Sequence, residues 1–490
     1  MGVLMVASEI SPWAKTGGLA DVVGAMPEAL ADLGHDVTVV VPKHRGIDAP
    51  RAATMSRGVR LGALAEDITY HTLTFASNLR VVFVDCPKYF DRESLYGAGG
   101  REYSDNADRF GLLSVAALDY GEGRAGGLPI EIVHAHDWQA GLVPTLLRSI
   151  GSRWPRLAAA GRVFTIHNMA YQGQFPREVV PRLGLPWDAF GIDRGEFWGR
   201  FSFLKAGIVD SDYITTVSPK YRSETITPAA GAGMEGVLAA RVSRYIGILN
   251  GIDTRAWNPQ TDPHLPAHYG PSDLSGKAVC KRALLARFNL PVGDDALARP
   301  VIGMVSRLVP QKGLDLIEAA ADELVALDAS WTFIGTGDRR YETFLQSLAA
   351  RYPSRVGVHI GFDEGLAHLL EAGSDIFLMP SLFEPCGLNQ MYSLRYGTVP
   401  VVHAVGGLDD TVQPFTPRAR SANGFKFDEP TPEALVRTVK QAVRLFRQPD
   451  AWARLMATGM AEDHSWSHSA REYVKVYRRA RLVAAHRGAA

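Results

Sequence analysis

The chain has no surplus of charge of either sign. Its 490 residues include 52 Lys and Arg side chains against 52 Asp and Glu side chains, so its formal net charge is zero. A protein that binds nucleic acid or an anionic membrane through a general electrostatic field needs a cationic surplus. Unless a local basic patch lies hidden in this balance, we expect neither nucleic acid nor a membrane as a partner.

The chain also has little cysteine. Its three residues, Cys86, Cys280 and Cys386, are odd in number and far apart, which argues against a disulfide framework or a cysteine zinc site. The first apolar run has no basic region before it and ends by Pro12, so we expect neither a signal peptide nor a membrane helix. These features predict a cytoplasmic protein.

The first turn lacks the spacing of the two common phosphate-binding loops. The apolar run Val3–Ala7 leads into Lys15-Thr16-Gly17-Gly18, where the lysine precedes the glycine pair, so neither a dehydrogenase nor a kinase is favoured. A strand followed by a glycine turn that opens a helix still offers free N–H groups and a positive helix end to a phosphate. The alternative is a tight strand-to-helix connection without a ligand.

The length predicts two domains, because 490 residues exceed what one hydrophobic core holds. Apolar runs of strand length alternate with helical patterns, and continuous hydrophobicity indicates parallel sheets covered on both faces. We expect an α/β protein with two doubly wound, Rossmann-like domains. The predicted strands after the first are 37–41, 81–85, 132–135, 163–166, 213–217, 302–305, 331–334, 358–360, 376–379 and 400–403.

The domain junction is predicted at Ile248–Asp253, where an Asn-Gly turn precedes an irregular segment over 258–275. A new strand–helix series begins at Pro300. The last helix, over 467–484, is amphipathic, and we expect it to pack across the boundary. The expected domains are therefore 1–247 and 248–465, with a C-terminal helix at 466–490 that crosses back to the first domain.

Two glycine-rich phrases resemble each other across the chain. Gly17–Val23 recurs in form as Gly406–Val412, and each is predicted to be a turn that opens a helix. Ligands of doubly wound sheets bind at the carboxyl ends of the strands. Two facing domains would thus place both turns on one cleft, unless the similarity arises by chance.

Two cations follow the strand at 302–305. Arg307 and Lys312 lie five residues apart around a turn. Arginine binds two oxygens at once and lysine supplies a point charge, which suits a diphosphate that gains negative charge as it leaves. The alternative is a pair of solvated surface cations, but their position at a strand end favours the diphosphate.

The phrase Phe383–Gln390 also follows a predicted strand. Glu384 is expected to accept hydrogen bonds from sugar hydroxyls, and the segment Cys386-Gly387-Leu388-Asn389 is expected to offer backbone N–H groups to phosphate at a helix start. One loop would then bind both halves of a nucleotide-sugar. The alternative for Glu384 is a capping residue.

His134-Ala135-His136-Asp137-Trp138 lies at the end of a predicted strand. Two histidines share one strand face, but no third ligand lies nearby in the sequence, so we expect no metal. Asp137 is interpreted as a sugar-binding or charge-stabilising carboxylate, with Trp138 as an apolar wall. Both histidines have core packing as the alternative, which we favour for His134.

His167 follows the strand at 163–166 in the same way. It is expected to donate a hydrogen bond to a sugar hydroxyl beside the reacting carbon. A single histidine usually packs in a core, but several strand ends with polar tips in both halves favour a site.

Read in order, these phrases resemble the bacterial glycogen synthases and plant starch synthases, a family of retaining GT-B glucosyltransferases. The resemblance covers almost the whole chain. The phrases that carry it are Lys15–Val23, Gly34–Val37, Pro42–Gly46, His134–Trp138, Phe164–Gly173, Ile248–Asp253, Trp257–Pro259, Ser306–Asp315, Phe383–Leu388, Gly406–Val412 and Ser465–Ser467.

The resemblance implies transfer of glucose from ADP-glucose to the non-reducing 4-hydroxyl of an α-1,4-glucan such as glycogen, with retention of configuration and without a cofactor. It implies a role in catalysis for Asp137, His167, Arg307, Lys312 and Glu384. It implies donor binding by Lys15, Gly18, Asn250, Phe362, Cys386, Gly387, Leu388 and Asn389, with Phe362 as the aromatic that covers adenine.

The chain departs from the family pattern at a few positions. Gln139 stands where His is usual, Asn389 where Thr is common and Phe362 where Tyr is common, and none of these changes removes a charge that the chemistry needs. Related transferases that use other sugars carry a second Glu eight residues after the first to hold ribose. Here that position is Tyr392, as in the glycogen synthases.

No residue pair stands out as a nucleophile with its base, so we expect the leaving diphosphate itself to help deprotonate the acceptor. Double displacement stays open. So do a different nucleotide-sugar donor, an epimerase or phosphorylase of the same fold, and a non-catalytic glucan-binding regulator. The sequence leaves open the choice between ADP and UDP, the oligomeric state, regulation and the preferred acceptor length.

Overall fold

The computed structural model describes residues 1–124, 127–419 and 421–488 and divides into two compact units. The first unit comprises Met1–Gly251 and Trp466–Ala490, and the second comprises Ile252–Ser465. Within the described residues, no helix combines the length and the apolar character needed to cross a bilayer.

The first unit is built on a twisted sheet with the strand order β14-β13-β9-β8-β1-β2-β5-β4-β3. The strands are β1 (Gly2–Val6), β2 (Asp36–Pro42), β3 (Ala53–Leu61), β4 (Leu64–Ala76), β5 (Leu79–Asp85), β8 (Ile130–His136), β9 (Gly161–Ile166), β13 (Tyr213–Thr216) and β14 (Tyr245–Gly247). From β14 to β5 neighbouring strands run parallel, as predicted, and most of their residues are buried, as expected for a sheet covered on both faces.

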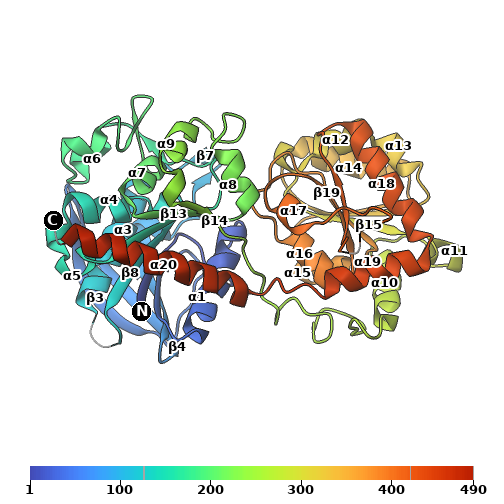
Figure 1. Cartoon of the computed structure of the whole chain (residues 1–490), viewed down its shortest axis with the longest axis horizontal. Coiled ribbons are helices and arrows are strands. Elements are labelled where there is room, and N and C mark those ends of the chain that lie inside the picture. The colour runs from blue at the N-terminus through green and yellow to red at the C-terminus, as the bar shows by residue number, and fades with distance from the viewer. Residues whose placement is uncertain (125–126, 420, 489–490) are drawn as a thin grey trace. The chain divides into compact units, whose positions relative to one another are not determined.

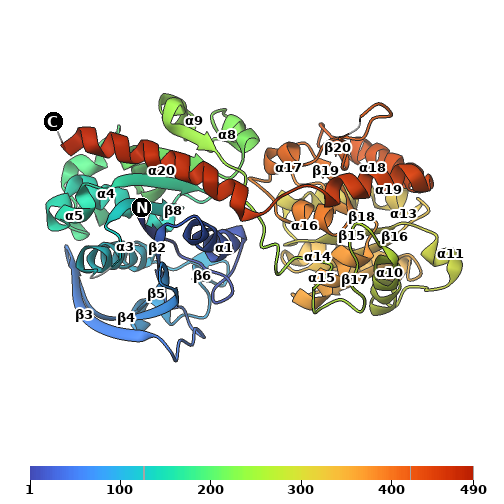
Figure 2. The same cartoon turned by 60° about the horizontal axis from the view of Figure 1, so that its bottom comes forward.

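One edge of this sheet carries an antiparallel hairpin that the sequence did not predict. The hairpin of β3 and β4 adds to β5 in antiparallel register (Figure 2). Six of the nine β3 residues, from Ala53 to Gly58, are exposed in succession. The hairpin therefore lacks the continuous hydrophobicity by which the buried strands were recognised.

Helices cover both faces of this sheet. They are α1 (Gly18–Asp32), α2 (Pro87–Phe90), α3 (Asn106–Gly123), α4 (Leu142–Ser149), α5 (Pro155–Ala158), α6 (Val179–Arg182), α7 (Phe203–Asp210), α8 (Pro219–Thr225), α9 (Glu235–Ala240) and α20 (Trp466–Gly488). The short 3₁₀ turns are η1 (Trp138–Ala140), η2 (Gly151–Arg153), η3 (Trp187–Phe190) and η4 (Val242–Arg244). Small sheets are formed by β6 (Gly97–Ala98) with β7 (Arg101–Glu102), and by β10 (Gln174–Phe175), β12 (Arg200–Ser202) and β11 (Glu196–Phe197).

The C-terminal helix α20 belongs to the first unit, which confirms the prediction that it crosses back. It lies along α1 and against β8 and β9 (Figure 1). Tyr473 and Tyr477 are fully buried in the core of that unit. A side chain at Gly161 would lie 2.8 Å from the Ala480 carbonyl carbon, so the glycine allows the helix to approach the strand closely.

The second unit has a parallel sheet with the strand order β17-β16-β15-β18-β19-β20. Its strands are β15 (Val301–Val305), β16 (Ser330–Gly335), β17 (Val356–Ile360), β18 (Ile376–Met379), β19 (Val399–His403) and β20 (Phe425–Phe427). Its helices are α10 (Ser275–Arg287), α11 (Asp294–Leu297), α12 (Leu314–Ala319), α13 (Ala321–Val325), α14 (Arg339–Arg351), α15 (Glu364–Gly373), α16 (Asn389–Arg395), α17 (Gly406–Thr411), α18 (Pro432–Phe446) and α19 (Pro449–Met460), with the 3₁₀ turn η5 (Pro310–Lys312).

Each sheet has one point at which the strand order reverses. In the first unit it lies between β1 and β8, and in the second between β15 and β18. Loops after two adjacent strands diverge at such a point and leave a crevice for a ligand. Lys15 and Asp137 follow β1 and β8, and Lys312 and Glu384 follow β15 and β18, so the topology places these candidates at the reversal points.

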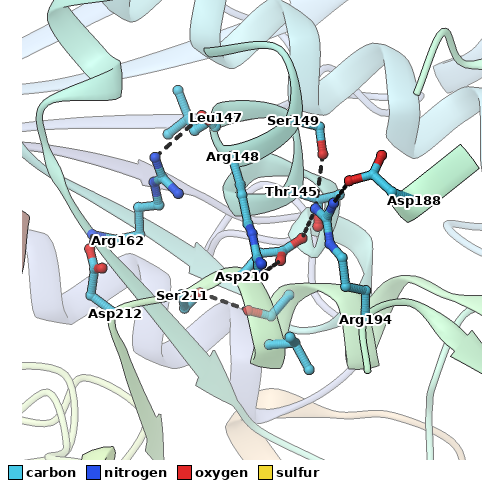
Figure 3. Close-up of polar contacts among 12 residues, drawn as sticks. Thr145, Leu147, Arg148, Ser149, Arg162, Asp188, Arg194, Asp210, Ser211 and Asp212 are labelled. Carbon is cyan, nitrogen blue, oxygen red and sulfur yellow. Dashed lines mark hydrogen bonds and ion pairs between the residues drawn. The ribbon is translucent and has the colours of Figure 1, made fainter. Parts of the chain in front are cut away.

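An ionic network centred on the buried side chains of Arg194 and Asp210 joins α4, α7 and the segment after η3 in the first unit (Figure 3). Arg194 donates to Asp210 at 3.0 Å, to Asp188 at 2.8 Å and to Ser149 at 2.9 Å. Arg148 donates to the other oxygen of Asp210 at 2.7 Å. Since the Asp210 side chain is only 1% exposed, its charge depends on these two arginines for compensation.

Candidate functional site

The first turn has the predicted strand–turn–helix geometry. Gly17 is the extended N-cap of α1, and Gly18 is its first residue. Lys15 is exposed, and its ammonium donates to Asp21 in the first turn of the helix at 2.6 Å. The turn thus presents a cation beside a helix N-terminus, the arrangement that suits an anion.

A buried carboxylate that the sequence motifs did not indicate fixes this turn. Glu9 accepts hydrogen bonds from the Thr16 backbone N–H and from the Thr16 hydroxyl, both at 2.6 Å. The Tyr96 hydroxyl also donates to Glu9, and it lies 2.8 Å from the Ser8 hydroxyl. The signal in the sequence is the position of Glu9, a carboxylate directly after a buried strand.

Asp137 adopts a strained backbone conformation at the end of β8. Its φ of 56° and ψ of 180° lie in a region that is almost restricted to glycine, at a cost of about 1–3 kcal/mol. Its carboxylate accepts the His167 N–H at 2.7 Å, and its own N–H donates to Thr165. Desolvation raises the pKa of Asp137 to about 7, against the lowering effect of the hydrogen bonds from His167 and Asn168.

Three histidines form a buried row between β8 and β9. His134 contacts the hydroxyls of Thr165 at 2.6 Å and Tyr477 at 2.8 Å, while His136 Nδ1 lies 2.9 Å from His167 Nε2. Burial lowers the pKa of His134 and His167 to about 3 and that of His136 further below its usual range. All three are therefore neutral at pH 7, and His134 has its partners within the core.

Two further residues of the first unit lie at the same edge of the sheet. Trp138 is buried between Phe110 and Phe175 and packs so closely on Gly173 that a side chain there would lie 2.3 Å from its ring. Asn250 follows β14 and is buried, and its Oδ1 has no hydrogen-bond partner among the described residues. An unpaired buried amide oxygen is a polar group free to accept a ligand hydroxyl.

In the second unit, the two predicted cations differ in their surroundings. Arg307 is exposed, and no ion pair joins its guanidinium to another side chain in the described part of the chain. Lys312 is largely buried, and its ammonium lies 2.5 Å from Glu384 Oε2. Gly313, with a φ of 74°, permits this turn to pack on the neighbouring loop, since a side chain there would lie 2.1 Å from the Pro380 carbonyl oxygen.

Glu384 is held by neighbours that the sequence motifs did not indicate. The Ser381 hydroxyl donates to the same Oε2 at 3.0 Å, and His403 Nδ1 donates to the Ser381 carbonyl at 2.7 Å. The side chain of Glu384 is 9% exposed. A buried lysine and a hydroxyl thus stabilise a carboxylate at the reversal point of the sheet.

The segment Cys386–Asn389 leads into α16, which begins at Asn389 with Leu388 as its N-cap. Gly387 has a φ of 71°, and Asn389 donates its side-chain amide to the Val305 carbonyl at 3.0 Å. The N-terminus of α17 is already used within this loop, because the Gly407 N–H lies 3.2 Å from the Glu384 and Pro385 carbonyls. The repeated glycine phrase at 406–412 therefore supports the loop.

Phe362 follows β17, and 82% of its surface is exposed. The preceding Gly361 has a φ of 143°, and the following Asp363 caps α15 by accepting the Leu366 N–H at 2.9 Å. An aromatic ring fixed between a glycine and a helix start can stack on a planar ligand.

Tyr392, at the position where related transferases carry a second Glu, is part of a buried aromatic column. Its ring stacks on Trp257 at 3.8 Å between centroids, and Trp257 stacks on His368 at 3.7 Å. His368 and Tyr396 both contact Asp262, whose pKa remains below its usual value because these hydrogen bonds outweigh desolvation. Tyr392 therefore anchors the segment that enters this unit.

Within each unit, the topology brings together most of the predicted residues. Lys15, Gly18, Asp137, His167 and Asn250 follow strands of the first sheet, and Arg307, Lys312, Phe362, Glu384 and the segment to Asn389 follow strands of the second. No group of three or more His, Cys, Asp or Glu side chains in the described parts of the chain has an arrangement that would hold a metal ion.

The chain matches two family models and is similar to characterised proteins over nearly its full length. Residues 2–240 match the starch synthase catalytic domain, and residues 293–454 match the glycosyl transferases group 1. The glycogen synthase of Anaeromyxobacter dehalogenans (strain 2CP-1 / ATCC BAA-258) is 51% identical over 98% of this chain and 99% of its own. The glycogen synthase of Myxococcus xanthus (strain DK1622) is 48% identical, and the match covers 97% of this chain and 99% of that protein.

A solved structure has the same fold throughout. The catalytic domain of starch synthase IV from Arabidopsis thaliana, bound to ADP and acarbose, superposes with a TM-score of 0.88. It is 32% identical in sequence, and the match covers 98% of this chain and 99% of that domain.

Proposed function

The chain belongs to the glycogen and starch synthase family of GT-B glycosyltransferases, and from this premise we propose that it transfers glucose from ADP-glucose to an α-1,4-glucan. The acceptor is the non-reducing 4-hydroxyl, and the anomeric configuration is retained. The chain's three cysteines are buried and form no disulfide among the described residues, which suits the reducing cytoplasm.

The observation that carries the proposal is the ion pair of Lys312 and Glu384, with the exposed Arg307 five residues before Lys312 in the same turn. A nucleotide-sugar has an anionic diphosphate joined to a neutral, hydroxyl-rich hexose. Lys312 and Arg307 suit the first part, and Glu384 suits the hydroxyls of the second. The lysine and the carboxylate compensate each other, so neither of these largely buried charges is left unpaired.

The chemistry is departure of the diphosphate assisted by cations. As the glycosidic bond to phosphate breaks, charge builds on the diphosphate, and Arg307, Lys312 and the amides of Leu388 and Asn389 stabilise that charge. The acceptor hydroxyl attacks from the same face, and the leaving phosphate oxygen takes its proton. Asp137 and His167 hold the glucosyl group, with His167 neutral and able to donate or accept one hydrogen bond.

Within the first unit, we assign Lys15, Gly18, Asp137, His167 and Asn250 to donor and glucosyl binding. Within the second unit, Phe362 covers the base, and the residues after β15 and β18 bind the diphosphate and the sugar.

One assay tests the function and its rivals. Radiolabelled glucose is offered to glycogen from ADP-glucose and from UDP-glucose, each with and without a chelator. We expect incorporation from ADP-glucose that is insensitive to the chelator. Incorporation from UDP-glucose alone indicates a different donor, and none from either indicates a non-catalytic glucan-binding regulator.

A further inference from the structure

Trp198 is an exposed tryptophan in an unusual backbone conformation. It lies at the tip of the hairpin formed by β11 and β12, with 81% of its surface exposed and a φ of 53°. A bulky residue rarely adopts a positive φ, and the cost is typically about 1–3 kcal/mol. An exposed indole at the tip of a turn offers a flat apolar face on which a ligand can stack.

The hairpin is built to hold this residue. Glu196 accepts the Gly199 N–H at 2.7 Å and so closes the turn. Below it, the buried Lys205 donates to the carbonyls of Ile192 and Glu196 at 2.7 and 2.6 Å. The neighbouring Phe197 is 8% exposed and anchors the tip to the unit. Trp198 is therefore presented from a fixed turn.

The loop that contains Ala232 and Gly233 lies next to the edge of the Trp198 indole. A side chain at Gly233 would lie 2.9 Å from the Phe197 ring and 3.6 Å from Trp198 Nε1. Gly233 and Ala232 have φ values of 84° and 50°. Both loops adopt left-handed backbone where they meet, and most of the ring surface stays in solvent.

These loops are joined to the segment that carries His167. Gln172, five residues after His167, donates its amide to the Ala232 carbonyl at 2.9 Å, and its own carbonyl accepts the Ser202 hydroxyl at 3.0 Å. β10 pairs with β12 directly after Gln172. In the same segment, Tyr171 is 51% exposed. The hairpin that carries Trp198 is therefore hydrogen-bonded to the segment that follows His167.

We propose that Trp198 is an outer acceptor subsite, on which a glucose ring of the α-1,4-glucan stacks some units away from the reacting end. This inference rests on the proposed function and names a residue that positions its acceptor. The face of a glucose ring presents C–H groups, which an indole covers while the sugar hydroxyls stay hydrated. Continuity with the His167 segment favours the glucan over a second protein chain as the occupant.

Trp198→Ala tests the proposal, with Trp198→Phe as the conservative variant. Phe75→Ala is the matched control, because Phe75 is an exposed aromatic, 54% exposed, on β4 of the same unit. We expect Trp198→Ala to raise the KM for maltoheptaose about fivefold to tenfold and to leave the KM for ADP-glucose unchanged. Trp198→Phe and Phe75→Ala should stay within twofold of wild type. An unchanged maltoheptaose KM in Trp198→Ala overturns the proposal.

A binding measurement separates this inference from the proposed function. In native gels that contain glycogen, the wild-type chain should be retarded, and Trp198→Ala should lose much of that retardation. Wild-type protein that binds glycogen but transfers no glucose contradicts the proposed function alone. Equal retardation of wild type and Trp198→Ala contradicts the subsite alone.

Two controls keep the result interpretable. If Trp198→Ala fails to fold, the fluorescence change on adding maltoheptaose is compared between wild type and Trp198→Phe, and an equal change in both overturns the proposal. Ultracentrifugation detects the rival occupant. A lower mass for Trp198→Ala at unchanged glucan affinity shows that the ring binds a second copy of the chain, and it also overturns the proposal.

Discussion

Lys312 and Glu384, separated by 72 positions in the sequence, meet at 2.5 Å between Nζ and Oε2. They follow β15 and β18, the two strands between which the order of the second sheet reverses. Each residue is a candidate for a different half of the donor, and in the proposed binding mode their mutual contact gives way to contacts with diphosphate and glucose. The ion pair compensates two largely buried charges.

Arg307→Ala and Lys312→Ala should both lower kcat about a hundredfold to a thousandfold, because each removes one preorganised cation from the leaving diphosphate. Their effects on stability should differ. Arg307 is exposed, so its loss should change the free energy of unfolding by less than about 0.5 kcal/mol. Loss of Lys312 leaves Glu384 buried without its cation and should cost about 1–3 kcal/mol. Steady-state kinetics and urea denaturation measure the two effects.

Normal turnover of ADP-glucose in both variants would contradict the mechanism. Equal stability of the two variants would contradict the account of the ion pair, since that account assigns a compensating contact to Lys312 alone.

Asp137→Asn should remove a pH dependence near neutrality. The pKa of Asp137 is raised to about 7, so its carboxylate is half ionised at that pH, and wild-type kcat/KM should rise with pH through 7 as the charge-stabilising form appears. Because the folded pKa exceeds the unfolded value of 3.8, Asp137 favours the folded state least at high pH. Relative to wild type, the Asn variant should therefore gain thermal stability from pH 5 to pH 8.

Rate profiles and melting temperatures across that range test both statements. An Asn variant that keeps the inflection near pH 7 would show that another group causes it, and a constant difference in Tm would contradict the raised pKa.

The sequence predicted the positions at strand ends because continuous apolar runs identify parallel strands, whose carboxyl ends share an edge. Arg307, Glu384, Asp137 and His167 were found in this way, and the structure places each after the expected strand. Their roles in catalysis stay predictions, since a position at a strand end is only the first condition for a site.

What the sequence did not reveal depends on contacts between loops. Glu9 is hydrogen-bonded to Thr16 in the same turn and to Tyr96, which lies far away in the sequence. Hydrophobic periodicity cannot predict such contacts between polar side chains. The pairing of Lys312 with Glu384 requires the order of strands in the sheet, which periodicity does not give. The hairpin of β3 and β4 was missed because one of its faces meets solvent.

Asp210 and Asp188 both pair with Arg194, yet they should differ strongly in their contribution to stability. Asp210 is 1% exposed, and its replacement by Ala leaves Arg194 buried with one partner fewer, at a cost of about 3–5 kcal/mol. Asp188 is 70% exposed, so Asp188→Ala should cost less than about 1 kcal/mol. Chemical denaturation of the two variants provides a matched comparison, and equal losses would contradict the dependence on burial.

Phe362→Ala should weaken donor binding without affecting the fold. The ring is 82% exposed, so its removal loses few packing contacts. The free energy of unfolding should therefore stay within about 0.5 kcal/mol of wild type. If the ring stacks on the base, the KM for ADP-glucose should rise about fivefold to tenfold, while the KM for glycogen stays constant. Phe362→Tyr preserves the stacking face and should resemble wild type.

Because an aromatic plane stacks on either base, the ratio of kcat/KM for ADP-glucose and UDP-glucose should change little in Phe362→Ala. A large change in that ratio would assign base selection to Phe362, and an unchanged KM for both donors would remove the ring from the site.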